Sequence, residues 1–286
     1  MPPSVTENLD RRTVEDFGAE WSVFDQTRLG DEELNLQFDG YFGIFPWGSL
    51  PPGAVGFDAG CGSGRWAKRV APRVGRLYCI DASPEAVVVA QRNLVRHSNC
   101  TAEVATIEAL PFDDESMDFG YSVGVLHHLP DPEEGLRRCV AKLKSGAPFL
   151  LYLYYALDNR PRWFRGVWRA ADVVRHVICR LPFRAKLIAT ALIAALIYLP
   201  LARAALLLEK LGVDSEQLPL ATYRHRSFYS MRTDALDRFG TRLEHRFRRE
   251  DITEMMTRSG LCEVVFSDRA PYWCAVGRRS PIGRST

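Results

Sequence analysis

A chain of 286 residues, 47% of them hydrophobic, is long enough for one large α/β domain or two small ones. Its 37 basic and 35 acidic residues leave a formal net charge of +2, which is far from the excess of a nucleic-acid-coating protein. The seven cysteines have no CxxC spacing, so we expect reduced thiols, a cytoplasmic protein and no metal site. The N-terminus carries acids and prolines where a signal peptide needs an apolar run, so we expect no export.

Residues 1–53 are predicted to form an N-terminal helical lid segment. A helix is expected from Thr13 to Phe24, because Phe17, Trp21 and Phe24 have spacings of four and three and share one helical face. The aromatic face either closes over a bound ligand or packs a helix against a sheet, and both interpretations stay open.

Residues 54–157 alternate short apolar runs with segments of helical period, a pattern typical of βαβ units and a parallel sheet. Ser83 before Pro84 and Asp131 before Pro132 are expected as N-caps with a first-turn proline. The predicted strands are Ala54–Ala59, Arg76–Asp81, Ala102–Thr106, Met117–Val123 and Phe149–Tyr155, and the predicted helices are Arg65–Val70, Pro84–His97 and Pro132–Lys144.

A helical insertion is predicted for residues 158–232, before the last two strands. Residues 233–286 are expected to complete the sheet, with a helix near Glu250–Arg258 and strands near Glu263–Ser267 and Tyr272–Gly277. The expected fold class is therefore α/β, a doubly wound, mostly parallel seven-stranded sheet of Rossmann-like type with a helical insertion.

The most informative motif is an apolar strand that runs into Gly60, Gly62 and Gly64 and then into a helix. Glycines let the backbone turn tightly and approach a ligand closely. The dinucleotide fingerprint GxGxxG would need a third glycine at Arg65, so the motif departs from it. About twenty residues further on, Asp81 ends the second strand, where its carboxylate can accept hydrogen bonds from both hydroxyls of an adenosine ribose.

From Val55 to Tyr155 the sequence resembles the class I S-adenosylmethionine-dependent methyltransferases, in particular the small-molecule group that includes quinone-biosynthesis enzymes. The resemblance implies S-adenosylmethionine as cofactor. Thr106 stands where many relatives carry an Asp that faces the adenine amino group, so Ile107 backbone and packing can take its place. The cofactor-binding residues that the resemblance implies are Asp58, Gly60, Cys61, Gly62 and Gly64 around the methionine part, Asp81 and Ala82 at the ribose, Thr106 and Ile107 at the adenine, and Ser122 after the fourth strand.

Methyl transfer from a sulfonium is an in-line displacement, so positioning alone supplies most of the acceleration. For a hydroxyl acceptor, a base within hydrogen-bond reach helps, and His127 and His128 follow the fourth strand at the substrate edge of the sheet. Adjacent histidines face different ways, so at most one is expected to be the catalytic base, and capping or packing of the next helix is the alternative. Tyr152 and Tyr154 share one strand face and are interpreted as sheet core.

The insertion carries an uncharged apolar stretch, Leu187 to Ala202, a little shorter than the roughly 20 residues of a membrane span. One crossing would also separate the last two strands from their sheet. Before it, Arg160 to Lys186 holds eight basic residues against the single acid Asp172. Three interpretations stay open: a lid over the substrate pocket, a homodimer interface, and a peripheral membrane contact through residues 160–208.

These patterns predict a methyltransferase that acts on a small, hydrophobic or amphiphilic acceptor, most simply at oxygen. No nucleic-acid partner is expected, because the basic residues cluster beside an apolar segment rather than along a groove with stacking aromatics. The alternative is a scaffold protein that keeps the cofactor site without turnover, since fold does not imply function.

Overall fold

The structure is a computed structural model that describes residues 8–215 and 218–281. The first seven residues of the predicted lid segment, residues 216 and 217 of the predicted insertion and the last five residues of the predicted C-terminal segment lie outside the described residues.

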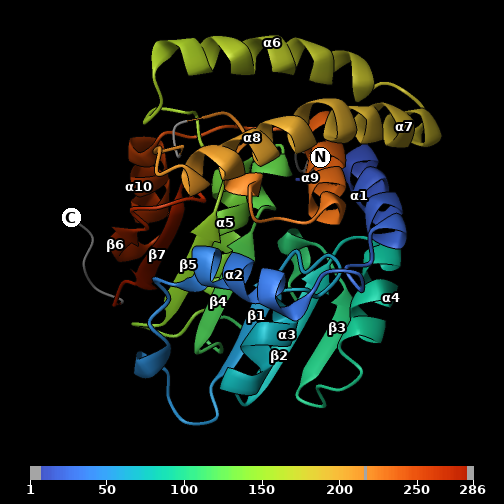
Figure 1. The fold of residues 1–286 in the computed structure, drawn as a ribbon. Helices are drawn as coiled ribbons and strands as arrows, with labels where there is room; N and C mark the ends of the chain where they lie inside the picture. Colours follow the sequence, from blue (N-terminus) through green and yellow to red (C-terminus); the bar gives the residue numbers. More distant parts are fainter. Residues whose placement is uncertain (1–7, 216–217, 282–286) are drawn as a thin grey trace, which may run out of the picture.

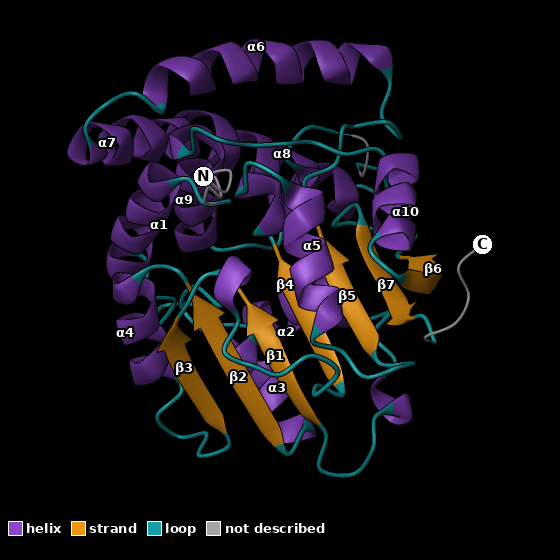
Figure 2. Cartoon of the chain, turned by 180° about the vertical axis from the view of Figure 1, so that it is seen from behind, coloured by secondary structure: helices purple, strands orange, loops and turns teal. Residues whose placement is uncertain are grey.

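Seven strands form one sheet in the order β3-β2-β1-β4-β5-β7-β6 (Figures 1 and 2). β1 to β5 run parallel, whereas β7 is antiparallel to both β5 and β6. This confirms the predicted doubly wound, mostly parallel seven-stranded sheet. The strands are β1 Val55–Ala59, β2 Arg76–Asp81, β3 Cys100–Val104, β4 Phe119–Val123, β5 Pro148–Tyr152, β6 Leu261–Phe266 and β7 Cys274–Arg279.

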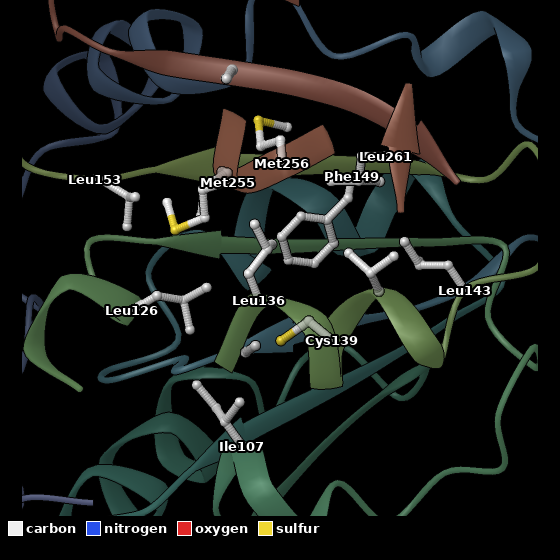
Figure 3. Packing of buried hydrophobic residues seen from close by; sticks show 14 of the residues in the cluster. Ile107, Leu126, Leu136, Cys139, Leu143, Phe149, Leu153, Met255, Met256 and Leu261 are labelled. Atoms are coloured by element: carbon white, nitrogen blue, oxygen red, sulfur yellow. The ribbon is translucent and has the colours of Figure 1, made fainter. Parts of the chain in front are cut away.

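Helices cover both faces of the sheet, which explains why the central strands are continuous apolar runs. One face packs on α5 (Pro132–Ala141) and α10 (Arg249–Arg258), and Figure 3 shows side chains of both helices around Phe149 of β5. The other face packs on the helices α2 Asp31–Phe42, α3 Ala67–Val70 and α4 Pro84–Asn93.

The helices that follow β2 and β4 begin as the sequence predicts. The Ser83 hydroxyl accepts a hydrogen bond from the backbone N–H of Ala86 (3.2 Å), and the Asp131 carboxylate accepts one from Glu134 (3.0 Å). Both helices end three or four residues earlier than expected. β5 also ends early, at Tyr152, so the two following tyrosines are not strand residues.

The predicted insertion forms three helices beyond the carboxyl ends of the parallel strands (Figures 1 and 2). α6 (Arg162–Ile178) is followed by α7 (Phe183–Ile193) and α8 (Leu199–Lys210), which join through one π-helical turn into a single helix. The π turn precedes Pro200, whose ring cannot fit under the carbonyl of the preceding α-helical turn.

α9 (Phe228–Gly240) lies beneath these helices, and the predicted domain boundary at residue 232 falls inside it. The α9 side chains Met231, Ala235 and Phe239 pack against Ala194 and Tyr198 of the long helix in a third apolar cluster. α9 thus links the insertion to α1 (Arg11–Val23), which packs on both α9 and α4.

Candidate active site

The loop after β1 needs its glycines for two different reasons. Gly60, Gly62 and Gly64 all have positive φ, at +87°, +51° and +72°. A Cβ at Gly60 would lie 2.4 Å from the Val125 side chain, and one at Gly62 would lie 2.8 Å from the indole of Trp21. A Cβ at Gly64 would press on α4. The first two glycines therefore keep a cradle open, and the third allows close helix packing.

Asp81 ends β2 beside this loop, as predicted. One carboxylate oxygen accepts a hydrogen bond from the backbone N–H of Gly62 (2.8 Å) and the other from Ser83 (2.9 Å). Burial raises the pKa of Asp81, and the backbone N–H groups of Ser83, Gly62 and Ala82 oppose that rise. Each oxygen keeps lone-pair capacity for a ligand hydroxyl.

A cavity of about 650 Å³ opens over the glycine loop at the carboxyl edge of the sheet. The predicted site residues that line it are Gly60, Cys61, Gly62, Asp81, Ala82, Ile107 and His128. The cavity also reaches Tyr152, Tyr154 and Asp237, so it joins the loop to a second group of polar side chains.

Two predicted cofactor residues, Asp58 and Ser122, are buried in the sheet and do not line the cavity. Asp58 is buried in β1 beside Tyr121, and burial raises the pKa of its carboxyl group well above the usual range. The buried Ser122 hydroxyl donates a hydrogen bond to the carbonyl of Ala59 (2.9 Å). The predicted contact of each of these two residues with the cofactor stays a prediction.

Only part of the predicted adenine turn lines the cavity. Thr106 and Gly64 do not line the cavity, whereas Ile107 and its neighbour Ala105 do. Thr106 stands at the N-terminus of a short 3₁₀ turn and makes no side-chain cap. That the backbone and packing of Ile107 serve the adenine stays a prediction.

The two histidines have different surroundings. His127 is fully buried, does not line the cavity, and burial lowers its pKa well below the usual value. His128 lines the cavity with its Nδ1 2.7 Å from the carbonyl of Leu243, and burial lowers its pKa to about 4. Nδ1 of a neutral His128 donates this bond, which leaves Nε2 without a partner as an acceptor. The predicted catalytic role of either histidine stays a prediction.

Sequence reasoning missed a buried carboxyl group on α9. Asp237 lines the cavity, and one of its oxygens accepts a hydrogen bond from the Tyr154 hydroxyl (2.5 Å). Its other oxygen is buried without a partner. Burial raises the pKa of Asp237 to about 7, and the charges of Asp234 and Glu244 add to that rise. Nothing in the sequence around Asp237 marks it, because only the tertiary packing brings α9 to β5.

The interpretation of Tyr152 and Tyr154 as sheet core is wrong. Both side chains line the cavity, because Tyr152 ends β5 and Tyr154 follows it at the carboxyl edge of the sheet. The Tyr154 ring stacks on His127 with 3.9 Å between ring centroids. Tyr152 meets Tyr41 of α2 edge to face at 4.9 Å.

Residues of the N-terminal helices line the cavity, and the lid interpretation stays a prediction. Phe17 and Trp21 of α1 line it, and the Arg65 guanidinium lies 5.7 Å from the Trp21 ring. Phe24 follows the last residue of α1 and packs on Tyr229 instead, with 5.6 Å between the rings. Two of the three predicted aromatic residues therefore face the site.

Comparison with known proteins agrees with this arrangement. Residues 57–151 match a family model described as a methyltransferase domain. The chain is 30% identical over 127 residues to phosphoethanolamine N-methyltransferase 2 of Caenorhabditis elegans, which covers 43% of this chain and 28% of that protein. It is 32% identical over 102 residues to a ubiquinone biosynthesis O-methyltransferase of Xanthomonas campestris, which covers 35% of this chain and 43% of that protein.

Among solved structures, the chain resembles a possible exported protein of Bordetella parapertussis, with a TM-score of 0.50 at 16% identity over 87% of this chain and 68% of that one. This likeness shows the fold alone. The chain spans less than half the length of the two enzymes above. The segment that matches the methyltransferase-domain model runs from β1 to β5 and contains the whole glycine loop, so the likeness to S-adenosylmethionine-dependent methyltransferases covers this part of the chain.

Proposed function

We propose that this chain transfers the methyl group of S-adenosylmethionine to an oxygen atom of a small amphiphilic acceptor. One observation carries the proposal: a single cavity is lined both by the glycine loop with Asp81 and by the Tyr154–Asp237 pair. The cradle at Gly60 and Gly62 and the two oxygens of Asp81 fit the methionine part and the ribose of this cofactor.

The bound cofactor supplies an electrophilic methyl group on a sulfonium. The protein then has to position an acceptor oxygen in line with that methyl group and to take up a proton as the new C–O bond forms and the S–CH₃ bond breaks. Asp237 suits the second task, because a carboxyl group with a pKa of about 7 is substantially ionised at neutral pH and still basic enough to accept a proton. The Tyr154 hydroxyl fixes one oxygen of Asp237 and leaves the other for the acceptor.

The walls of the cavity support an acceptor with both apolar and anionic parts. Phe164 and Tyr223 offer aromatic surface, and Arg226 and Arg246 offer guanidinium groups that also pair with Asp234 (2.8 Å) and Glu244 (2.6 Å). The Arg246 guanidinium lies 5.3 Å from the Tyr154 ring. Guanidinium groups bind carboxylates and phosphates through paired hydrogen bonds, so an acidic group on the acceptor would be oriented here.

Replacing Asp81 by Ala is expected to weaken cofactor affinity roughly 10- to 150-fold, because it removes charge-assisted hydrogen bonds of about 1.5–3 kcal/mol. Calorimetric titration with S-adenosylmethionine and S-adenosylhomocysteine measures this. Because Asp81 also accepts bonds from Gly62 and Ser83, Asp81→Asn is a milder second variant whose amide oxygen keeps one of these two bonds, whereas its NH₂ group cannot accept the other. Unchanged affinity in a folded Asp81→Ala protein would exclude the proposed ribose contact.

The acceptor can be sought by incubating the protein with S-adenosylmethionine labelled on its methyl group and with lipid and small-molecule extracts. We expect label in an amphiphilic product whose methyl group is on oxygen, and no label with Asp81→Ala. Label in RNA would contradict the expectation that no nucleic acid is bound. Cofactor binding without any label would favour the scaffold alternative. The seven cysteines, all described and all free, support the further proposal of a cytoplasmic location.

A further inference from the structure

The insertion exposes an unusual amount of apolar surface. Within the helix Phe183–Lys210, a stretch of 18 residues has a mean hydropathy of 2.2, yet only 22% of that stretch is buried. On it, Ile188, Leu192 and Leu196 are 65%, 55% and 72% exposed. On α6, Trp163, Val167 and Val177 are each more than half exposed. We call these six side chains the apolar face.

The apolar face is distinct from the side of each helix that packs on the protein. Ala194, Tyr198 and Ala202 of the long helix are buried against α9. On α6, Ile178 belongs to the same cluster, and Arg175 donates to the carbonyl of Thr241 (3.0 Å). The inner sides therefore already hold the helices in place, and the exposed side chains add nothing to that packing.

Arginines border the apolar face. Between positions 160 and 211 the sequence has ten basic residues and two acidic ones. The acid on α6, Asp172, already pairs with the buried Arg175 at 2.7 Å. Arg162, Arg165 and Arg169 of α6 are exposed. Apolar side chains that stand beside uncompensated arginines match the interfacial region of a bilayer that contains anionic lipids.

The long helix lies on the protein and does not cross away from it. Lys186 near its start is buried and pairs with Asp16 of α1 at 2.7 Å. β7, which follows the insertion, pairs with β5, which precedes it, so the chain must return to the same side. The outer side of these helices can therefore lie on the surface of a bilayer, but the helices cannot span it.

We propose that the apolar face docks this protein on the surface of an anionic lipid bilayer. The cavity extends to this end of the molecule, because Arg160 and Phe164 at the start of α6 and residues 220–226 after α8 line it. An amphiphilic acceptor held in the bilayer can thus enter between the docked helices. This last step rests on the proposed function, whereas the docking itself does not.

The test compares Ile188→Ser/Leu192→Ser/Leu196→Ser with wild type in co-sedimentation with vesicles of phosphatidylcholine, with or without phosphatidylglycerol. Wild type should bind the anionic vesicles and lose at least about tenfold in binding at high salt, because the attraction of arginines is screened within about 8–10 Å at physiological ionic strength. The triple variant should lose at least about tenfold at low salt. Each substitution lies on an exposed position, so the fold should be kept.

Val95→Ser/Val104→Ser/Val265→Ser is the matched control. These exposed valines lie in the turn after α4, on β3 and on β6, away from the insertion. It should bind vesicles like wild type. No vesicle binding by wild type, or equal loss in both triple variants, overturns the proposal. Sedimentation equilibrium tests the other occupant. If wild type does not bind vesicles but forms a dimer, and only the Ile188/Leu192/Leu196 variant loses that dimer, the apolar face contacts a second copy of the chain instead. Vesicle binding needs no methyl transfer, so failure of the proposed function leaves this result unaffected.

Discussion

Replacing Asp237 by Asn should lower kcat for an oxygen acceptor by about 10²–10⁴, the range over which a positioned general base acts. Asn keeps the acceptor for the Tyr154 hydroxyl but cannot take up a proton. Cofactor affinity should not change, because Asp237 belongs to α9 and not to the glycine loop. Single-turnover methyl transfer together with calorimetric titration measures both quantities.

The pH profile separates a base from a residue that only shapes the cavity. Wild-type kcat/KM should rise with pH through about 7, because the base acts in its ionised form and burial raises the pKa of Asp237 to about 7. This acidic limb should vanish in Asp237→Asn. If the variant keeps the limb and the rate, Asp237 is not the base, and His128, whose Nε2 is without a partner, becomes the next candidate.

As pH rises through about 7, the stability of the fold should fall while the activity rises. The folded pKa of Asp237 lies above the value of an unfolded Asp, so between about pH 4 and 7 the folded state binds more protons than the unfolded one. The contribution of Asp237 to stability is therefore present at low pH and is lost as pH rises through about 7. Asp237→Asn should melt at the same or a higher temperature than wild type above pH 7.

Glu20→Gln is the matched control for this experiment. Glu20 of α1 is also a buried carboxyl group whose pKa is raised well above the usual value by burial and by Asp237, but it does not line the cavity. The Gln variant should keep both its rate and its acidic limb, because Glu20 does not line the cavity and the pKa of Asp237 is raised by burial and by the charges of Asp234 and Glu244 instead. A rate loss as large as that of Asp237→Asn would mean that any change in this buried cluster is harmful.

Replacing Gly62 by Val should lower cofactor affinity by at least about tenfold. The backbone at Gly62 has φ +51°, where a β-branched residue costs about 1–3 kcal/mol, and its Cβ would lie 2.8 Å from the Trp21 indole. The loop must therefore change shape, and the hydrogen bond from its N–H to Asp81 should be lost. Titration with S-adenosylhomocysteine measures the affinity.

A second pair of variants separates backbone strain from the clash with the lid. Gly62→Ala alone should weaken binding less than Gly62→Val, and combining it with Trp21→Ala should restore the part that comes from the clash. Normal affinity in Gly62→Val would show that the loop is only a turn and does not approach the ligand.

Local patterns in the sequence were sufficient for the sheet and for the cofactor half of the site. Apolar runs separated by segments of helical period predict seven strands, and all seven are present. Glycines at alternate positions after a strand and an acid after the next strand mark the ligand edge, because residues adjacent in a βαβ unit are adjacent in space. Even there, the sequence does not show which way a side chain points: Asp58 and Ser122, which the resemblance places at the cofactor, do not line the cavity.

The acceptor half of the site and the apolar face were decided by tertiary structure. Asp237 and Tyr154 are 83 residues apart, and they meet only because α9 packs beneath the insertion and β5 ends early at Tyr152. Likewise, the composition of the insertion shows that it is apolar and basic, but burial depends on which side of each helix faces α9. Leu196 and Tyr198 are two residues apart, yet one is 72% exposed and the other almost fully buried, because a helix turns neighbouring side chains toward different surroundings and only the packing partner determines which side is covered.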